Sequence, residues 1–229
     1  MTCVYGVLLE DEAAHERIII DMIKIENTEV FGFEAAIRGA RNPMNSWARS
    51  DSGFETTASG EKVYHLGEND KDLMTRLVKA GNEHRKFMRQ IVIWTDITAP
   101  LYWWKEYDTY KVGTVANSFS TLHKLTYKPF ERDDFSHDHL SETGLEALDS
   151  LIVTLNKLRD RYLENKDKQD WWDMIQLLPS SYNQRRTVSL NYENALSIYR
   201  QRRGHKLDEW HVFRHWVEGL PCADELITE

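Results

Sequence analysis

The stretch LPSSYNQRRTVSLNYENALSIYRQR, residues 178–202, carries the signals that decide the fold. Its Leu178-Pro179 pair ends a helix predicted over 171–178, because a residue before proline avoids helical geometry. A second helix is predicted over 190–203 and is closed by Gly204. These two helices form the framework from which the rest of the chain is interpreted.

Asn191 and Arg202 lie eleven residues apart in the second predicted helix. That spacing puts both on one face, about 16 Å apart along the axis. An amide and a guanidinium so placed can hold a heterocycle and a phosphate group. In the alternative, structural interpretation, Asn191 caps the helix and the arginine is solvated surface charge. Spacing alone favours the structural interpretation.

Basic residues gather in the same region. Between Arg185 and Lys206 there are six basic side chains and a single acid, Glu193, a local charge of +5. The whole chain of 229 residues has a formal charge of −8, which leaves −13 for the remainder. A protein with that balance is not expected to bind a nucleic-acid polymer or an anionic membrane. The basic island, residues 185–206, is the first place to expect a small anionic ligand.

The composition bounds the class of protein. Apolar residues make up 41% and aromatic residues 11% of the chain, which is enough for a sizeable core. The two cysteines, Cys3 and Cys222, lie near opposite ends, so neither a disulfide scaffold nor a cysteine zinc site is expected. The first residues lack a basic leader pattern, and no stretch is long and apolar enough to span a bilayer. We expect a cytoplasmic protein that does not enter membranes.

Apolar periodicity predicts several helices and a few strands, hence an α+β domain. Strands are predicted at 4–9, 30–37 and 91–97; helices at 12–25, 69–89, 101–111, 145–162, 171–178, 190–203 and 208–218; and a long loop at 39–67. The pairs Trp103-Trp104 and Trp171-Trp172 have the chemistry to stack on a base, but on helices one member of each is expected in the core. His137 and His139 lack a third ligand, so the sequence predicts no metal site.

The run 178–202 resembles, without a gap, the corresponding stretch of the flavin-dependent thymidylate synthases, the ThyX family. Pro179, Arg185, Asn191 and Arg202 fall in matching places. Residues 206–210, KLDEW, are similar to the His-Ala-Gln-Trp-Glu of that family, displaced by one position. Residues 96–102, DITAPLY, resemble the strand that precedes the family signature. The resemblance covers residues 84–214.

The signature itself, RHRxxSxNExSxRY, is replaced here by residues 109–123, TYKVGTVANSFSTLH, with one apparent insertion. Lys111, Thr114 and Ser120 keep a charge or a hydroxyl, whereas Thr109, Tyr110 and Leu122 replace basic residues. Glu106 stands where the family has a glutamine, and Ile175 where it has an arginine that contacts the nucleotide phosphate. A lost arginine removes a charge-assisted fork of about 1.5–3 kcal/mol per bond.

The resemblance implies a single ThyX-like domain over 1–229, with an antiparallel sheet flanked by helices. It also implies a homotetramer that binds FAD between subunits, takes electrons from NADPH and a carbon from methylenetetrahydrofolate, and methylates dUMP. The flavin would be contacted by His84, Lys111, Asn117, Asn191 and Asn194. The nucleotide would be contacted by Glu106, Ser120, Arg185 and Arg202. No residue is assigned a catalytic role.

Two other functions stay open at the level of the sequence. The altered signature fits a ThyX-like protein that binds a nucleotide or a partner without flavin chemistry. A helical interaction protein with no small ligand would instead place the basic island on a convex surface.

Overall fold

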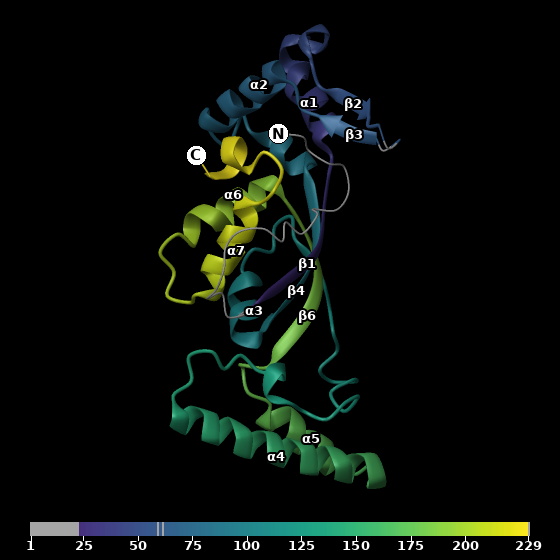
Figure 1. The fold of residues 1–229 in the computed structure, drawn as a ribbon, viewed down its shortest axis with the longest axis vertical. Coiled ribbons are helices and arrows are strands. Elements are labelled where there is room, and N and C mark those ends of the chain that lie inside the picture. The colour runs from purple at the N-terminus through teal and green to yellow at the C-terminus, as the bar shows by residue number, and fades with distance from the viewer. Residues whose placement is uncertain (1–22, 59, 61, 229) are drawn as a thin grey trace.

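The computed structural model describes residues 23–58, 60 and 62–228. Its centre is a four-stranded antiparallel sheet in the order β1-β4-β6-β5 (Figure 1). The strands are β1 (Lys24–Phe31), β4 (Val92–Pro100), β5 (Val115–Ser118) and β6 (Asn183–Asn191). Strands β2 (Gly53–Thr56) and β3 (Lys62–His65) form a separate hairpin. The expected α+β fold with an antiparallel sheet flanked by helices is confirmed.

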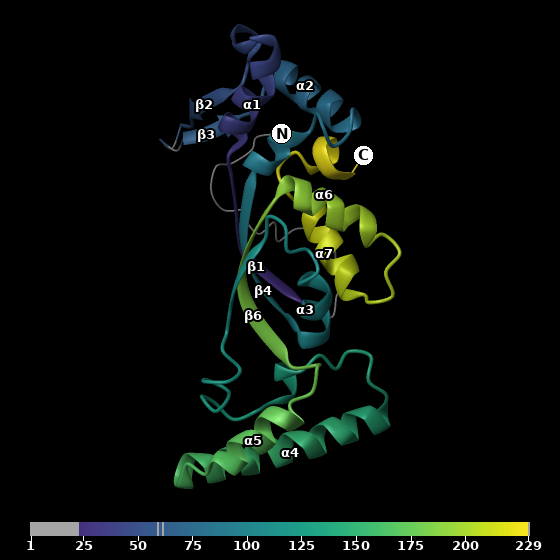
Figure 2. The same ribbon diagram turned by 180° about the vertical axis from the view of Figure 1, so that it is seen from behind.

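Helices surround the sheet in three groups, as Figures 1 and 2 show from opposite sides. Helices α3, α6 and α7 lie on one side of the sheet; α1, α2 and the hairpin lie at one end; α4 and α5 lie at the other. Their bounds are α1 Phe33–Arg41, α2 Glu68–Lys79, α3 Leu101–Tyr107, α4 Glu142–Asn165, α5 Lys168–Leu177, α6 Tyr192–Gln201 and α7 Glu209–Glu218. Within the described residues no helix is long and apolar enough to cross a membrane.

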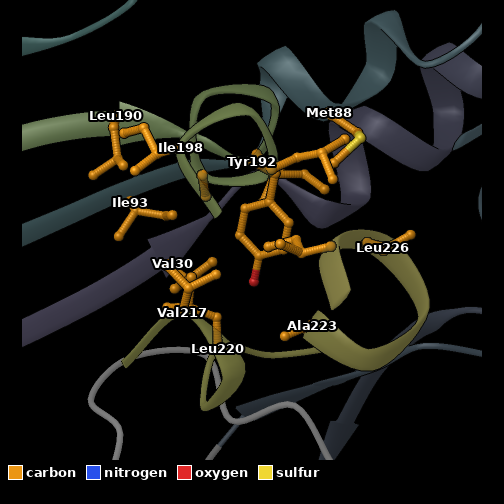
Figure 3. Close-up of a cluster of buried hydrophobic side chains, with 14 of the residues drawn as sticks. Val30, Met88, Ile93, Leu190, Tyr192, Ile198, Val217, Leu220, Ala223 and Leu226 are labelled. Atoms are coloured by element: carbon orange, nitrogen blue, oxygen red, sulfur yellow. The ribbon is translucent and has the colours of Figure 1, made fainter. Parts of the chain in front are cut away.

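Alternation along β4 separates the two faces of the sheet. Ile93, Thr95 and Ile97 are buried under the helices, whereas Trp94 is 45% exposed on the opposite face. The main core lies between the sheet and the helices, and Figure 3 shows Tyr192 at its centre. The Tyr192 hydroxyl donates to the Pro221 carbonyl at 2.7 Å, so this large ring is buried with its polar atom satisfied.

A second, smaller core lies beneath α4 and α5. It is built from Leu148, Leu155 and Leu158 of α4, Met174 of α5, and aromatic rings of the neighbouring loops. Leu101 packs against this small core, and Tyr102 packs against the main one. The Tyr102 hydroxyl also donates to the buried Glu209 carboxylate of α7, so α3 links the two cores.

A buried ion pair joins α1 to α2 at their end of the molecule. Arg41 Nε donates to Asp70 Oδ1 at 2.5 Å, and the two side chains are 4% and 0% exposed. The other oxygen, Asp70 Oδ2, accepts both hydroxyls of Ser50 and Ser52 at 2.7 Å and the Ser52 backbone N–H at 3.1 Å. Burial raises the pKa of Asp70, but the two serine hydroxyls and Arg41 outweigh it and leave that pKa below its usual value.

Several predicted elements are confirmed. The leucine stripe at 145–162 belongs to α4, the helix predicted at 208–218 is α7, and the predicted helix 171–178 is α5. Trp103 and Trp104 are both buried and pack edge to face. By contrast, Trp172 is 41% exposed, and Trp171 is only partly buried. The core role expected of one member of this pair is therefore wrong.

Other predicted boundaries are wrong near the N-terminal end. Residues 30–37 are not one strand, because Gly32 adopts a left-handed φ of 103° and separates β1 from α1. The predicted loop 39–67 contains the β2 and β3 hairpin, which the run of polar and glycine residues concealed. The elements predicted at 4–9 and 12–22 lie outside the described residues, and Lys24 and Ile25 belong to β1.

Three predicted helices are too long. The helix predicted at 101–111 is α3, which ends at Tyr107. The helix predicted to run to Arg89 ends at Lys79, and a 3-10 turn over Lys86–Gln90 follows it. The helix predicted from Leu190 begins at Tyr192, because Leu190 and Asn191 complete β6. Strand β6 was missed in the sequence, although its residues pair with β4 along their full length.

Candidate functional site

A polar cluster joins α3 to the end of α6. Arg202 Nη1 donates to Glu106 Oε2 at 2.9 Å, and Arg202 Nε donates to the Tyr110 hydroxyl at 2.9 Å. The same Glu106 oxygen accepts Trp210 Nε1 at 3.0 Å and lies 3.1 Å from His205 Nε2. The Arg202 guanidinium also lies 4.5 Å from the Trp210 ring centroid. Two residues predicted to bind the nucleotide, Glu106 and Arg202, are thus brought together as an ion pair.

The other end of α6 is organised by two asparagines. Asn191 Oδ1 accepts the Asn194 backbone N–H at 3.0 Å, and Asn194 Oδ1 accepts the Asn191 backbone N–H at 3.3 Å, which is a reciprocal cap. Asn194 Nδ2 donates to the Val112 carbonyl at 2.7 Å. Gly113, with a φ of 83°, brings its backbone close to both asparagine amides. The structural interpretation of Asn191 as a helix cap is correct.

Residues 106–113 therefore contact α6 at both of its ends, and we call this contact the α6 seam. Glu106 and Tyr110 contact Arg202, and Val112 and Gly113 lie against Asn194 and Asn191. The seam contains four of the nine residues predicted from the resemblance, as two pairs at opposite ends of α6: Glu106 with Arg202, and Asn191 with Asn194.

Three further predicted residues lie within the 106–113 stretch or shortly after it in the chain, and the described contacts of the seam do not include them. Lys111 is exposed in the turn after α3, and Asn117 is exposed on β5, the strand at the edge of the sheet. Ser120 comes just after β5, where its hydroxyl accepts the His123 backbone N–H at 3.2 Å. These side chains offer a positive charge, an amide and a hydroxyl along one exposed segment.

Arg185 lies elsewhere, on the sheet face opposite the helices. Its Nη2 donates to Asp96 Oδ2 at 2.8 Å, and Thr187 donates to Asp96 Oδ1 at 2.5 Å. Hydrogen bonds from Thr187, Asn27 and Arg185 lower the pKa of Asp96 to about 2. The structure does not bring Arg185 into the seam.

His84 is exposed in the turn that follows α2. Its neighbour Arg85 forms an ion pair with Glu193 of α6, with Nε 2.9 Å from Oε2 and Nη2 3.0 Å from Oε1. The turn that carries His84 is therefore fixed to the first turn of α6 through Arg85.

The basic island does not form one site. Arg185 pairs with Asp96, Arg186 pairs with Asp108 at 2.8 Å and Arg202 pairs with Glu106. Arg186 also lies over the Trp104 ring, with its guanidinium carbon 4.2 Å from the ring centroid. Acidic residues scattered through the sequence thus neutralise half of the island, which a local charge count does not reveal.

The two histidines considered for a metal make separate contacts. His137 Nδ1 lies 2.7 Å from the Phe135 carbonyl, and His139 Nε2 lies 3.2 Å from Asp208. Among the described residues there is no group of three or more side chains suited to a metal ion.

Sequence reasoning missed Tyr110, His205 and Trp210, which complete the cluster around Glu106. In the sequence, Tyr110 stands only where the family has a histidine. Trp210 is the one member with a usable signal, because it lies in the segment similar to the family's His-Ala-Gln-Trp-Glu.

No protein-family model and no curated protein matches the sequence. Solved structures do match. A flavin-dependent thymidylate synthase ThyX from Helicobacter pylori, complexed with FAD and dUMP, superimposes with a TM-score of 0.61 at 20% identity over 87% of this chain and 95% of that one. A second structure of the Helicobacter pylori enzyme, also with FAD and dUMP, gives a TM-score of 0.62 at 19% identity over 90% and 96%.

The chain has a ThyX-like fold. At this level of identity the similarity establishes the arrangement of helices and strands. The resemblance inferred from residues 84–214 agrees with it, and the structural match extends over most of the chain.

Proposed function

We propose that this protein is a ThyX-like enzyme that binds FAD and a pyrimidine deoxynucleotide such as dUMP, and carries out reductive methylation or a related one-carbon modification. The observation that carries the proposal is the α6 seam. In a fold whose solved neighbours hold FAD and dUMP, it joins residues predicted for the flavin (Asn191, Asn194) to residues predicted for the nucleotide (Glu106, Arg202).

The side chains of the seam and of the segment after it fit these ligands chemically. Bound FAD would supply the hydride, with NADPH and methylenetetrahydrofolate as co-substrates. Lys111 and Asn117 are exposed and offer a charge and an amide to the flavin. Glu106 holds Arg202 through Oε2 alone, so Oε1 is left to accept a hydrogen bond from a ring N–H. A carboxylate accepts where the family glutamine both accepts and donates, so Glu106 selects ring edges that present N–H groups.

The positions of the predicted residues support a site shared between copies of the chain. Arg185 is exposed on the sheet face opposite the helices, beside Asp96, whereas Arg202 ends α6 and contacts Glu106 of α3. One protomer therefore does not gather all of them, and a homotetramer with flavin between its subunits, as the family resemblance implies, would do so. We place this enzyme in the cytoplasm, which its two cysteines in 229 residues support.

The test begins with the purified protein and added FAD. We expect a bound flavin spectrum that changes when dUMP is added. Arg202→Ala should weaken dUMP binding about tenfold or more, because one charge-assisted contact is lost. Arg132→Ala, which removes an exposed arginine paired with Asp149 near α4, is the matched control and should bind as the wild type does.

Formation of dTMP from dUMP, NADPH and methylenetetrahydrofolate would establish the reaction. Absence of any flavin spectrum would overturn the proposal as a whole. Flavin and dUMP binding without consumption of NADPH or folate would overturn the enzymatic part and leave a non-catalytic nucleotide-binding protein.

A further inference from the structure

A small pocket lies between α1, the 3-10 turn over Trp47–Arg49 and the β2–β3 hairpin. Its cavity volume is about 270 Å³. Helix α1 and the hairpin form the end of the molecule opposite α4 and α5 (Figure 1), and none of the described residues that line the pocket belongs to the α6 seam. The pocket is therefore separate from the proposed nucleotide site.

Arg41 gives this pocket a hydrogen-bond donor. The side chain is 4% exposed, and two of its three nitrogens are bonded: Nε donates to Asp70 Oδ1 at 2.5 Å, and Nη1 donates to the Ser46 carbonyl at 3.3 Å. In the described part of the chain nothing bonds to Nη2, and Nη2 is not among the fully buried polar atoms that lack a partner. Because Arg41 lines the pocket, Nη2 is open to the cavity.

Ser50 gives the same pocket a hydrogen-bond acceptor. Asp70 is ionised at neutral pH, because its pKa lies below the usual value. An ionised carboxylate only accepts, so the Ser50 hydroxyl donates its proton to Asp70 Oδ2 at 2.7 Å and keeps its lone pairs for another donor. One carboxylate thus holds both groups in place, with Arg41 on Oδ1 and Ser50 on Oδ2.

A flat apolar surface adds to the pocket. The Trp47 indole lines it and is 50% exposed, and its Nε1 donates to Asn42 Oδ1 at 2.8 Å, which fixes the ring. Ile37 of α1, which is buried, is also part of the lining. A half-exposed indole held in one orientation can stack on a planar ring at a reduced cost in side-chain entropy.

The charges around the pocket cancel. The charged residues among the described ones that line it are Glu34, Arg38 and Arg41, and Arg41 is paired with Asp70. Glu34 Oε1 lies 3.9 Å from Arg38 Nη1, and both side chains are more than half exposed. Each guanidinium thus has a carboxylate beside it. The pocket therefore suits a neutral ligand better than an anion, because neither arginine is left without a counter-charge.

We propose that this pocket binds a small, neutral, planar heterocycle with a lactam group, in which a ring carbonyl lies next to a ring N–H. Arg41 Nη2 donates to the carbonyl, Ser50 Oγ accepts the N–H, and the ring stacks on Trp47. Cavities for drug-sized ligands measure about 300–1,000 Å³, so a cavity of about 270 Å³ suits one ring or two fused rings. The proposal does not depend on flavin or dUMP binding.

The experiment is calorimetric titration of the full chain at neutral pH, without FAD or dUMP. The probe is hypoxanthine, a neutral lactam of two fused rings. It is compared with purine, which lacks the lactam, with 1-methylhypoxanthine, which lacks the lactam N–H, and with benzoate, a planar anion. We expect saturable binding of one hypoxanthine per chain, and binding of each of the other three that is about fivefold weaker or more, because at least one hydrogen bond is lost.

Variants locate the binding in this pocket. Trp47→Ala should weaken hypoxanthine binding about fivefold or more, because the stacking surface is lost. Trp172→Ala removes another exposed indole, which is 41% exposed on α5, and should bind as the wild type does. Ser50→Ala should bind hypoxanthine and 1-methylhypoxanthine about equally, since the acceptor that distinguishes them is gone. Thermal unfolding checks that each variant folds, and the tryptophan pair tests the pocket even if Ser50→Ala does not fold.

Absence of saturable hypoxanthine binding, unchanged affinity in Trp47→Ala, or an equal loss in Trp172→Ala would overturn the proposal. Purine or 1-methylhypoxanthine binding as tightly as hypoxanthine would refute recognition of the lactam, and so would a folded Ser50→Ala variant that still prefers hypoxanthine to its 1-methyl form. Benzoate binding as tightly would refute the preference for a neutral ligand. Because no flavin or dUMP is present, failure here leaves the proposed enzyme function standing, and success does not support it.

Discussion

Replacing Asp70 with asparagine tests how the α1 and α2 end is held. The substitution keeps the shape of the side chain but removes its charge, which leaves the Arg41 guanidinium, 4% exposed, without its counter-ion. Breaking a buried ion pair from one side costs about 3–5 kcal/mol. Asp70 also accepts hydrogen bonds from Ser50 and Ser52, and an asparagine Nδ2 in place of Oδ2 could not accept them. We therefore expect the upper part of that range.

The assay is urea unfolding at neutral pH, with thermal unfolding as a second measurement. For a chain of this size, about 2–4 °C is lost per kcal/mol, so Tm should fall by roughly 6–20 °C. Asp72→Asn, on the same helix, removes an exposed partner of Arg76 and is the control, with an expected loss of about 0.5 kcal/mol or less. If Asp70→Asn loses no more stability than Asp72→Asn, the reasoning about the buried pair is refuted.

The pH dependence gives an independent check of the same site. The folded pKa of Asp70 is lower than its unfolded value, so the carboxylate stabilises the fold fully above the unfolded pKa, and this contribution is lost as the pH falls below about 4. Asp70→Asn should lack that part of the acid loss. A variant with the same acid loss as the wild type would show that other carboxylates account for it.

Two further predictions concern the sheet and the seam. The pKa of Asp96 is about 2 through its bonds to Thr187, Asn27 and Arg185, so its contribution to stability is lost as the pH falls from about 4 toward 2; unfolding curves of Asp96→Asn should be flatter than those of the wild type in that window, and parallel curves would contradict the prediction. Gly113→Ala should lower the free energy of unfolding in urea by about 1–2 kcal/mol, because φ is 83° and the new Cβ would lie 2.9 Å from Asn194 Oδ1. The control is Gly204→Ala, whose new Cβ would meet no neighbouring atom within 4 Å and which should lose much less. An equal loss in the two variants would count against the close approach at Gly113.

Local patterns predicted the helices whose apolar stripes and ends agree. In α4, Leu148, Leu155 and Leu158 repeat at helical spacing and are buried together. In α7, Asp208 precedes the helix and Gly219 follows it, so both ends were visible in the sequence.

Strand β6 shows where local patterns fail. Gln184, Arg186, Val188 and Leu190 alternate toward the helices, but two of the four are polar, so the period of two is hidden. On that face the Arg186 guanidinium stacks over the Trp104 ring and forms an ion pair with Asp108, and these contacts stabilise the charge there. Both partners lie far away in sequence, and no local rule identifies them.

The candidate site was predicted in its members but not in its geometry. Residue matching to a family pointed to Glu106 and Arg202, which are 96 positions apart in the chain. Their ion pair, and the role of Trp210 beside it, depend on how α3, α6 and α7 pack together. Spacing within a single helix contains no information about that packing. The Asn191 amide oxygen, a hydrogen-bond acceptor that suggests ligand binding in the sequence, instead caps α6 in the structure.

Helix α3 connects the main core to the small core, and this connection determines which part of the molecule can unfold locally. Leu101 belongs to the small core and Tyr102 to the main one, so two adjacent residues connect parts that bury their apolar surface separately. Because the two cores are separate, we expect an opening of α4 and α5 to expose the small core first and to leave the sheet and the seam closed. We therefore expect amide protons beneath α4 to exchange with water faster than those of the central sheet, which hydrogen-exchange measurements would show.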